Sequence, residues 1–173
     1  MTYIALGKYI VLLNNDTIPM DGWLDALVDT AERDESVGAV GSKLIFENGK
    51  LQEAGGIIWR DGNAWNYGRG QDPEHPDFNY TKDVDYISGA SLLIRTDLWR
   101  RLGGFDERYA PSYWEDADIA FRIREAGYRV VYQPRSTVIH TEGASSLTLT
   151  KQKFMQKNSR TFYNRWSHKL EDQ

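Results

Sequence analysis

Residues 10–19, IVLLNNDTIP, place two amides and a carboxylate directly after an apolar run. The run at 8–13 is short and contains β-branched and aromatic side chains, which predicts a strand buried on both faces of an α/β sheet. Pro19 and Gly22 then mark a turn, and apolar residues recur with helical spacing over 23–33. This order of strand, polar tip and helix predicts a layered α/β domain.

Strands and helices alternate along the rest of the chain, as apolar spacing and turn residues indicate. Residues 50–70 have the glycine-marked turns of a hairpin or an irregular excursion, and 71–83 predict an exposed loop long enough to form a flap. Further strands are predicted at 36–46, 84–94, 128–134 and 136–140, and further helices from 96 to a stop at 103–104, over 115–125 and over 150–168.

Length and composition predict one domain over residues 1–173. With 173 residues, 40% of them hydrophobic, the chain can bury one sizeable core. A net charge of −4 without a long basic run argues against nucleic acid as a partner. The chain has no cysteine, no apolar segment near the roughly 20 residues that span a bilayer, and no signal-type start, so a cytoplasmic location is expected.

The polar tip after the first predicted strand is a candidate ligand site. In an open α/β sheet, ligands bind at the carboxyl ends of the strands. Asn14, Asn15 and Asp16 stand at such an end, and a carboxylate flanked by amides offers hard oxygen ligands for Mg²⁺ or Mn²⁺ bridging to a phosphate. The alternative is a turn cluster that caps the helix after Pro19 or forms an Asx turn.

A second acidic cluster, formed by Glu115, Asp116 and Asp118, opens a predicted helix. The first turn of a helix favours negative charge, and Arg122 stands four residues after Asp118, so helix capping with an ion pair explains the cluster. Trp114, directly before it, supports a second interpretation. A carboxylate beside aromatic rings can have the proton affinity of a general base, and the rings can stack on a sugar.

His140 ends the predicted strand 136–140. A lone histidine is more often a structural residue than a ligand. The histidine and the two polar clusters therefore predict one functional site only if they converge in space.

Four segments carry a family resemblance: GKYIVLLNNDTIPMDGWLDAL, YISGASLLIRTDLWRRLGGFDE, YWEDADIAFRIREAGYRVVYQPRSTVIH and NSRTFYNRWSHKL. In this order and spacing they resemble the inverting nucleotide-sugar glycosyltransferases of family two, especially bacterial rhamnosyltransferase-like members, over nearly the whole chain. Asp116 and His140 lie 24 positions apart (140 minus 116), a separation that the family pattern accommodates.

The resemblance implies a GT-A fold, which is an α/β mixed sheet flanked by helices, together with a Mg²⁺ or Mn²⁺ ion and a UDP- or dTDP-sugar donor. By position, Asp16 is implied as the main carboxylate for the metal and the donor diphosphate, with Asn15 beside it. Asn14 stands where many members have a first aspartate, and its amide contributes no charge to a metal site. His140 matches the second metal ligand.

On the acceptor side, the resemblance implies that Asp116 is the catalytic base and that Gly89 and Ala90 floor the acceptor pocket. Trp114 and Glu115 are then candidates for acceptor contacts. Substitution with inversion needs one base for the acceptor hydroxyl and one cation for the leaving diphosphate, which suits this assignment. The implied acceptor is a glycan or a lipid-linked molecule in cell-envelope polysaccharide synthesis.

Members of this family normally begin with about a hundred residues of βαβ units that bind the nucleotide. Such units do not precede the strand predicted at 8–13, so we expect a partial domain with poor donor affinity and weak turnover alone. An exposed sheet edge left by their absence also predicts self-association.

Two further alternatives stay open at this stage. The chain could be a non-enzymatic carbohydrate-binding or assembly module of the same fold, whereas a phosphotransferase would need a phosphate-cradling glycine loop that the sequence lacks. The helix over 150–168 carries Phe154, Phe162 and Trp166 opposite basic residues. It could rest on an anionic membrane surface near a lipid-linked acceptor, or pack as an ordinary amphipathic helix.

Overall fold

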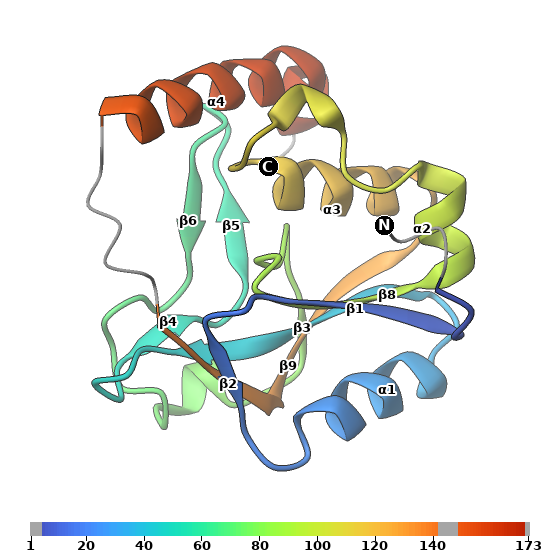
Figure 1. Ribbon diagram of the computed structural model, residues 1–173, viewed down its shortest axis with the longest axis vertical. Helices are drawn as coiled ribbons and strands as arrows, with labels where there is room; N and C mark the ends of the chain where they lie inside the picture. Colours follow the sequence, from blue (N-terminus) through green and yellow to red (C-terminus); the bar gives the residue numbers. More distant parts are fainter. Residues whose placement is uncertain (1–4, 142–148, 172–173) are drawn as a thin grey trace.

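A seven-stranded mixed sheet lies at the centre of the computed structural model, which describes residues 5–141 and 149–171 (Figure 1). The sheet order is β1-β8-β3-β9-β2, with β4 paired to β3 and β7 paired to β9. Strands β3 and β9 run parallel, and the other pairs run antiparallel. The strands are β1 Tyr9–Leu13, β2 Thr17–Pro19, β3 Val37–Ile45, β4 Leu51–Glu53, β7 Lys82–Asp83, β8 Ser91–Arg95 and β9 Arg129–His140.

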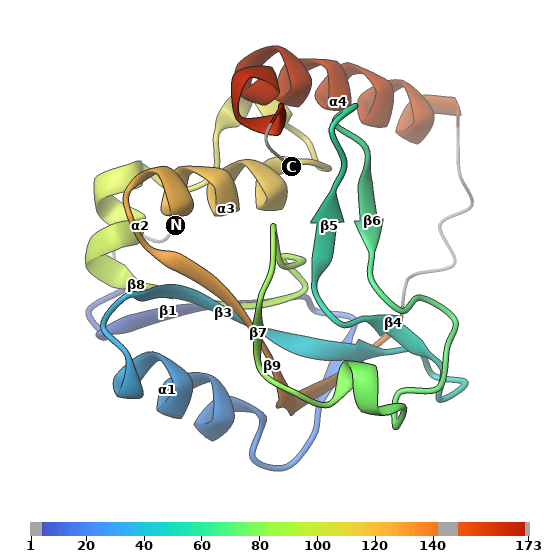
Figure 2. The same cartoon turned by 180° about the vertical axis from the view of Figure 1, so that it is seen from behind.

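Helices cover both faces of this sheet, so the predicted architecture of a mixed α/β sheet flanked by helices is confirmed (Figures 1 and 2). Helix α1 lies on one face, α2 and α3 lie on the other, and α4 forms an outer layer beyond α3. The helices are α1 Trp23–Arg33, α2 Thr96–Leu102, α3 Glu115–Glu125 and α4 Leu149–Leu170, with short 3₁₀ turns η2 Pro76–Phe78 and η3 Glu107–Tyr109.

Apolar side chains on each helix account for this layering. Leu27 and Ala31 of α1 pack against Val40 of β3 and Val131 of β9. The opposite core is larger and continues outward through α3 to α4, where Phe162 is fully buried. Burying an apolar side chain of this size stabilises a fold by about 1.5–3 kcal/mol, so both layers hold the sheet firmly.

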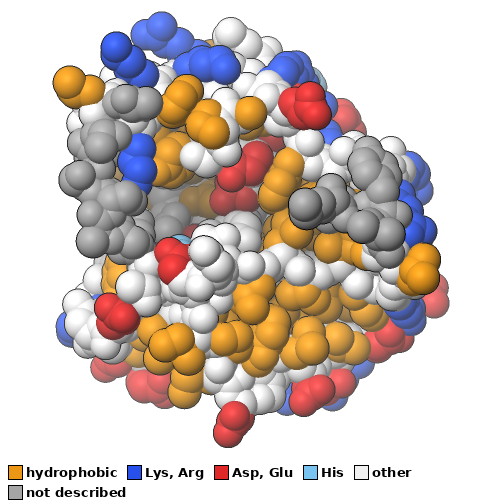
Figure 3. Space-filling model, in the orientation of Figure 1, with side chains coloured by type: hydrophobic (Ala, Val, Ile, Leu, Met, Phe, Trp, Pro, Cys, Tyr) orange, Lys and Arg blue, Asp and Glu red, His pale blue; other side chains and the backbone are white. Residues whose placement is uncertain are grey.

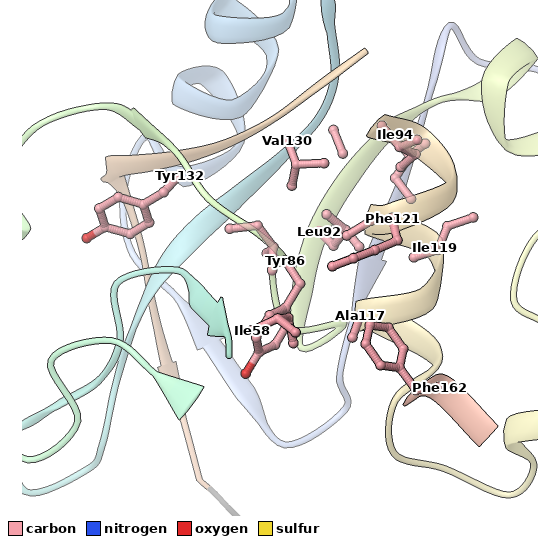
Figure 4. Close-up of a cluster of buried hydrophobic side chains, with 14 of the residues drawn as sticks. Ile58, Tyr86, Leu92, Ile94, Ala117, Ile119, Phe121, Val130, Tyr132 and Phe162 are labelled. Carbon is pink, nitrogen blue, oxygen red and sulfur yellow. The ribbon is translucent and has the colours of Figure 1, made fainter. Parts of the chain in front are cut away.

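A separate hairpin, formed by β5 Gly56–Ile58 and β6 Ala64–Asn66, stands against the α3 side of the sheet (Figure 2). The ring of Tyr86 packs so closely over Gly56 that a Cβ atom there would collide with it, which explains the glycine. Figure 4 shows Ile58 of the hairpin and Tyr86 in the same buried cluster as Phe121 of α3. The hairpin is therefore part of the core. Of the two forms predicted for 50–70, a hairpin or an irregular excursion, the structure contains the hairpin.

The positions of the four helices and of β3 agree closely with the sequence prediction. The predicted stop after 96–102 is a left-handed Gly103 with a φ of 77°. A glycine adopts this conformation without the steric penalty of a Cβ atom, so it ends the helix. The two strands predicted at 128–134 and 136–140 form one continuous strand, β9.

Two details of the prediction are wrong. Strand β1 is not buried on both faces, because it lies at a sheet edge among the described residues and only Ile10 is buried. The strand predicted at 84–94 is β8, which begins only at Ser91. The loop predicted at 71–83 is exposed over most of its length, as expected, while Phe78, which is 2% exposed, and the pairing of its end with β9 anchor it to the domain.

Candidate active site

The polar tip after β1 meets the end of β9 through backbone pairing. Strand β2 begins directly after the tip, and Thr17 is paired with His140 in the antiparallel register. The N–H of Thr141 donates to the carbonyl oxygen of Asp16 at 2.9 Å. Strand pairing thus brings together two side chains that are 124 positions apart (140 minus 16).

The side chains at this junction form a compact polar group. His140 Nε2 lies 3.3 Å from Asp16 Oδ1 and 3.4 Å from Asn14 Nδ2. The Asp16 side chain is 38% exposed and that of His140 is 13% exposed, so the group is open to solvent on the Asp16 side. Asn15 is exposed in the same turn.

Gln52 of β4 determines which nitrogen of His140 is free. Its Oε1 atom lies 3.0 Å from His140 Nδ1, and an amide oxygen can only accept, so Nδ1 carries the proton. In the neutral ring, Nε2 then presents a lone pair toward the Asp16 carboxylate, an arrangement that a cation satisfies. Gln52 is 3% exposed and was not predicted from the sequence.

A divalent cation fits this donor set. Two ligand atoms that each stand about 2.1 Å from one ion at roughly a right angle are about 3 Å apart, close to the observed 3.3 Å between Asp16 and His140. Among the described residues, no group of three or more His, Cys, Asp or Glu side chains could hold a metal. A Mg²⁺ or Mn²⁺ ion would therefore depend also on Asn14, water and substrate phosphates, as Mg²⁺ sites commonly do.

The alternative interpretation of the polar tip as a helix cap is wrong. The N-cap of α1 is Gly22, in a left-handed conformation, and no side chain caps this helix end. Asn14 and Asp16 instead face His140, and only the hydroxyl of Thr17, which donates to the Asn14 carbonyl at 2.6 Å, makes a local turn contact.

The loop that contains Gly89 and Ala90 links the second acidic cluster to the polar tip. Asp116 Oδ2 accepts the N–H of Gly89 at 3.4 Å, and its Oδ1 accepts the N–H of Ala117 at 2.8 Å. The next residue of the loop, Ala90, accepts the N–H of Asn14 through its carbonyl oxygen at 3.0 Å. Gly89 and Ala90 therefore join the two clusters that the sequence placed far apart.

The carboxyl groups of this second cluster bind protons more tightly than usual. Burial raises the pKa of Asp116, and the N–H groups of Ala117 and Gly89 oppose that rise. Burial and the neighbouring Asp116 charge raise the pKa of Glu115 to about 7. Both residues remain partly exposed, so a ligand can reach them. A carboxylate with a raised pKa that is open to a ligand is suited to general base chemistry.

A strained loop positions this cluster. Tyr113 and Trp114 both have a φ of 77°, which costs a residue with a side chain about 1–3 kcal/mol. Asn158 of α4 holds the loop, because its Nδ2 atom donates to the carbonyl oxygens of Tyr109, Ser112 and Tyr113 at 2.7, 2.9 and 3.0 Å. The Trp114 ring packs on Phe162 with centroids 5.0 Å apart and stays partly exposed.

Asp118, the third acidic residue, has a structural environment. It is fully buried and forms the expected ion pair with Arg122 at 2.7 Å, together with a second ion pair to Arg165 at 3.0 Å. Tyr109 and Trp166 also donate hydrogen bonds to it. The N-cap residue of α3, Trp114, forms no side-chain cap, but the acidic residues do stand in the first turn as predicted, and the predicted ion pair with Arg122 is confirmed.

The space-filling view shows acidic side chains gathered in a hollow on the face seen in Figure 1 (Figure 3). Basic side chains lie above this hollow, over α4. The aromatic residues predicted on one side of α4 do not form an exposed stripe, because Phe162 is 0% and Trp166 is 2% exposed. The ordinary amphipathic packing of this helix is therefore the better description.

Two solved structures share this fold. GalNAc-T7 with UDP, GalNAc and Mn²⁺ matches 93% of this chain and 32% of its own, with a TM-score of 0.68 and 16% identity. The mannosyltransferase PcManGT from Pyrobaculum calidifontis, in complex with GDP-Man and Mn²⁺, matches 84% of this chain and 35% of its own, with a TM-score of 0.53 and 17% identity. The likeness defines a GT-A glycosyltransferase fold.

The chain belongs to the family described as Glycosyltransferase like family 2, which matches residues 2–159. The O-antigen biosynthesis protein RfbC of Myxococcus xanthus is 36% identical over 149 residues, which are 82% of this chain and 11% of that protein. The N-acetylglucosaminyl-diphospho-decaprenol L-rhamnosyltransferase of Mycobacterium tuberculosis is 29% identical over 156 residues, which are 82% of this chain and 49% of that protein. The chain thus spans half or less of these relatives.

Proposed function

We propose that this chain carries the metal and acceptor side of an inverting glycosyltransferase, which moves a sugar from a nucleotide diphosphate to a glycan or lipid-linked acceptor in cell-envelope polysaccharide synthesis. The observation that supports this most directly is the bridge formed by Gly89 and Ala90. It joins the Asn14, Asp16 and His140 group to Asp116 through hydrogen bonds of 3.0 and 3.4 Å. Family membership and relatives named for O-antigen synthesis and rhamnosyl transfer support the same reaction class.

In this proposal, Asp16 and His140 would hold the cation, and Gln52 would orient the His140 ring by accepting from its Nδ1, which leaves Nε2 facing the cation. A bound Mg²⁺ or Mn²⁺ ion supplies positive charge that stabilises the diphosphate as a leaving group. Asn14 and Asn15 stand beside the ligand pair and can donate amide N–H groups to phosphate oxygens. The neutral amide of Asn14 leaves this site with less negative charge than an aspartate would give.

Asp116 acts on the opposite side of the anomeric carbon. Its carboxylate takes the proton of the acceptor hydroxyl while that oxygen bonds to the anomeric carbon and the carbon–oxygen bond to the diphosphate breaks. Attack from the side opposite the leaving group inverts the configuration. Trp114 offers a ring face for the acceptor sugar, and Glu115 offers a carboxyl for one of its hydroxyls.

Calorimetric titration tests the metal side without requiring turnover. Mn²⁺ is titrated first, and then UDP and dTDP with Mn²⁺ present, into wild type and the variants Asp16→Ala and His140→Ala. Asp21→Ala is a matched control, because Asp21 is an exposed aspartate five positions beyond Asp16 (21 minus 16). We expect nucleotide binding that depends on Mn²⁺, is lost in both site variants and is retained in the control.

The opposite result would count against a donor site in this chain. Binding of a glycan without any effect of metal or nucleotide would favour the alternative of a non-enzymatic carbohydrate-binding or assembly module. Weak turnover of the 173-residue chain by itself stays a prediction, which robust sugar transfer by the purified chain would contradict.

Two partner predictions also remain for experiment. Among the described residues, β1 pairs only with β8, and Leu13 beside its free edge is 41% exposed, which favours self-association. Size-exclusion chromatography over a range of concentrations measures this, and a constant monomer would contradict it. No helix in the described part of the chain is long and apolar enough to cross a membrane. Cytoplasmic location and peripheral membrane contact through α4 stay predictions of the sequence.

A further inference from the structure

Glu53, the last residue of β4, is a buried carboxyl group that the mechanism above does not use. Its side chain is 0% exposed. The Oε1 atom accepts the N–H of Ser88 at 3.0 Å, whereas Oε2 is buried without a hydrogen-bond partner among the described residues. Burying a polar atom without a partner destabilises a fold. The bond to Ser88 is therefore the hydrogen bond that anchors the Glu53 carboxyl group.

The loop that Glu53 holds connects both halves of the candidate site. Its three consecutive residues each bond to a different part: Ser88 to Glu53, Gly89 to the Asp116 carboxylate, and Ala90 to the backbone of Asn14. Fixing the Ser88 amide therefore also fixes the amide that Gly89 presents to Asp116, because the two N–H groups belong to adjacent peptide units.

Strand β4 reaches the other half of the site through the preceding residue. Gln52 holds His140 Nδ1 at 3.0 Å, and Glu53 holds Ser88. Successive side chains on a strand point to opposite faces, so two adjacent residues of β4 can reach toward both clusters. Both residues are buried, and their positions depend on the pairing of β4 with β3 rather than on any surface loop.

We propose that Glu53 is a positioning residue for the transfer reaction, holding the 88–90 loop through the Ser88 amide so that Gly89 donates to Asp116. This proposal rests on the proposed role of Asp116 as the base. Glu53 itself does not touch the reacting atoms, because it is enclosed by protein.

The charge state of Glu53 supports this role. Burial and the negative charge of Asp116 raise the pKa of Glu53 to about 8, while the Ser88 N–H opposes the rise. At neutral pH, Glu53 is therefore protonated. The charged and titratable groups that face Glu53 come from four parts of the chain, namely Asp116, Arg69, Tyr86 and Tyr132.

Nuclear magnetic resonance of the isotope-labelled chain tests the proposal without any substrate. The measured quantities are the amide shifts and hydrogen-exchange rates of Ser88 and Gly89, and the carboxyl carbon shifts of Glu53 and Asp116, from pH 4 to 10. The variants are Glu53→Gln, which is neutral and of equal length, Glu53→Ala and Asp116→Asn. Gln133→Ala is the matched control, because Gln133 is also buried and bonds to Thr30 away from this loop.

We expect the wild-type Ser88 amide to titrate with a midpoint of about 8, together with the Glu53 carboxyl carbon. Glu53→Gln should abolish this titration and leave exchange at Gly89 unchanged. In Glu53→Ala, exchange at Gly89 should be about tenfold faster, and the Asp116 midpoint should rise because its N–H donor is less well placed. Asp116→Asn should lower the Glu53 midpoint, because the repulsion between the two carboxyl groups is removed.

Several outcomes would overturn the proposal. One is a Glu53 midpoint near that of an ordinary glutamate, and another is a Gly89 amide that responds no more to Glu53→Ala than to Gln133→Ala. If Glu53→Ala does not fold, Glu53→Gln and Asp116→Asn still decide the question. The proposed function fails separately, since these shifts can behave as expected while Asp116→Asn leaves sugar transfer unchanged.

Discussion

Asp116 and Asp118 lie two positions apart on α3, yet their surroundings differ completely. Asp118 is fully buried, and its carboxylate accepts hydrogen bonds from two arginines, a tyrosine and a tryptophan. Asp116 stays partly exposed, and the hydrogen bonds that hold it come from the backbone amides of Gly89 and Ala117. A carboxylate that is paired with cations stabilises the fold, whereas a carboxylate that is held only by backbone amides can still accept a proton.

The largest expected effect concerns the proposed base. Asp116→Asn should lower the rate of sugar transfer about 10²–10⁴-fold, the usual contribution of a positioned general base. The measurement is release of UDP or dTDP in the presence of acceptor, by a form of the protein that turns over. The unfolding midpoint should fall only slightly, because the single oxygen of the asparagine side chain can still accept one of the two N–H groups, that of Gly89 or that of Ala117. An unchanged rate would remove Asp116 from the chemistry.

Asp118→Ala should produce the reverse pattern. Removing one partner of a buried ion pair leaves uncompensated charge, so we expect a loss of about 3–5 kcal/mol in the free energy of unfolding. Urea unfolding followed by tryptophan fluorescence measures this change. Asp29→Ala is the control, because Asp29 pairs with Arg33 on the surface at 3.7 Å and should contribute little. Equal losses of stability in Asp118→Ala and Asp29→Ala would show that the buried ion pairs of Asp118 stabilise the fold no more than a surface pair does.

Much of the fold could be predicted because the decisive signals are local. The helical spacing in α1, the glycine after α2 and the acidic start of α3 each concern residues within a few positions of one another. The partial burial of β1 could not be predicted, because a short apolar run looks the same in a strand that is buried on both faces and in one that is partly open to solvent. The packing of Phe78 against the hairpin side likewise depends on contacts between distant segments.

Part of the candidate site could likewise be predicted from the sequence, and part could not. Asp16, His140 and Asp116 stood at strand or helix ends, where side chains leave the core, and the family resemblance suggested the roles that we propose for them. Gln52 and Glu53 were missed, because a polar pair in a three-residue strand carries no periodicity and no motif. The only available signal was two polar residues between Leu51 and Ala54, which predicts a buried polar group but not its partner.

Gln52 offers a smaller test on the metal side. Gln52→Ala should weaken Mn²⁺ binding about 10–100-fold, because the His140 ring loses the acceptor that fixes its tautomer and orientation. Isothermal calorimetry at fixed pH measures the change, and Gln133→Ala again serves as the buried control. Equal Mn²⁺ affinity in wild type and Gln52→Ala would show that Gln52 does not orient a metal ligand.

The smallest expected effect is a dependence of stability on pH, which separates Glu53 from Asp118. The unfolded chain has an ordinary glutamate that has lost its proton by about pH 5, whereas folded Glu53 keeps its proton up to about pH 8. The folded state therefore binds more protons between these values, and its stability falls as the pH rises through this window. Between pH 6.5 and 8.5, Glu53 should account for a loss of about 1–2 kcal/mol in the free energy of unfolding.

Urea unfolding at a series of pH values should show a shallower fall in stability in Glu53→Gln. The fall that remains should come from Glu115, whose pKa is raised to about 7. Asp118→Ala should lower the whole curve without removing that fall, because the ion pairs of Asp118 are with Arg122 and Arg165 and do not involve Glu53. A wild-type curve that is flat above pH 6 would contradict the protonated state of Glu53.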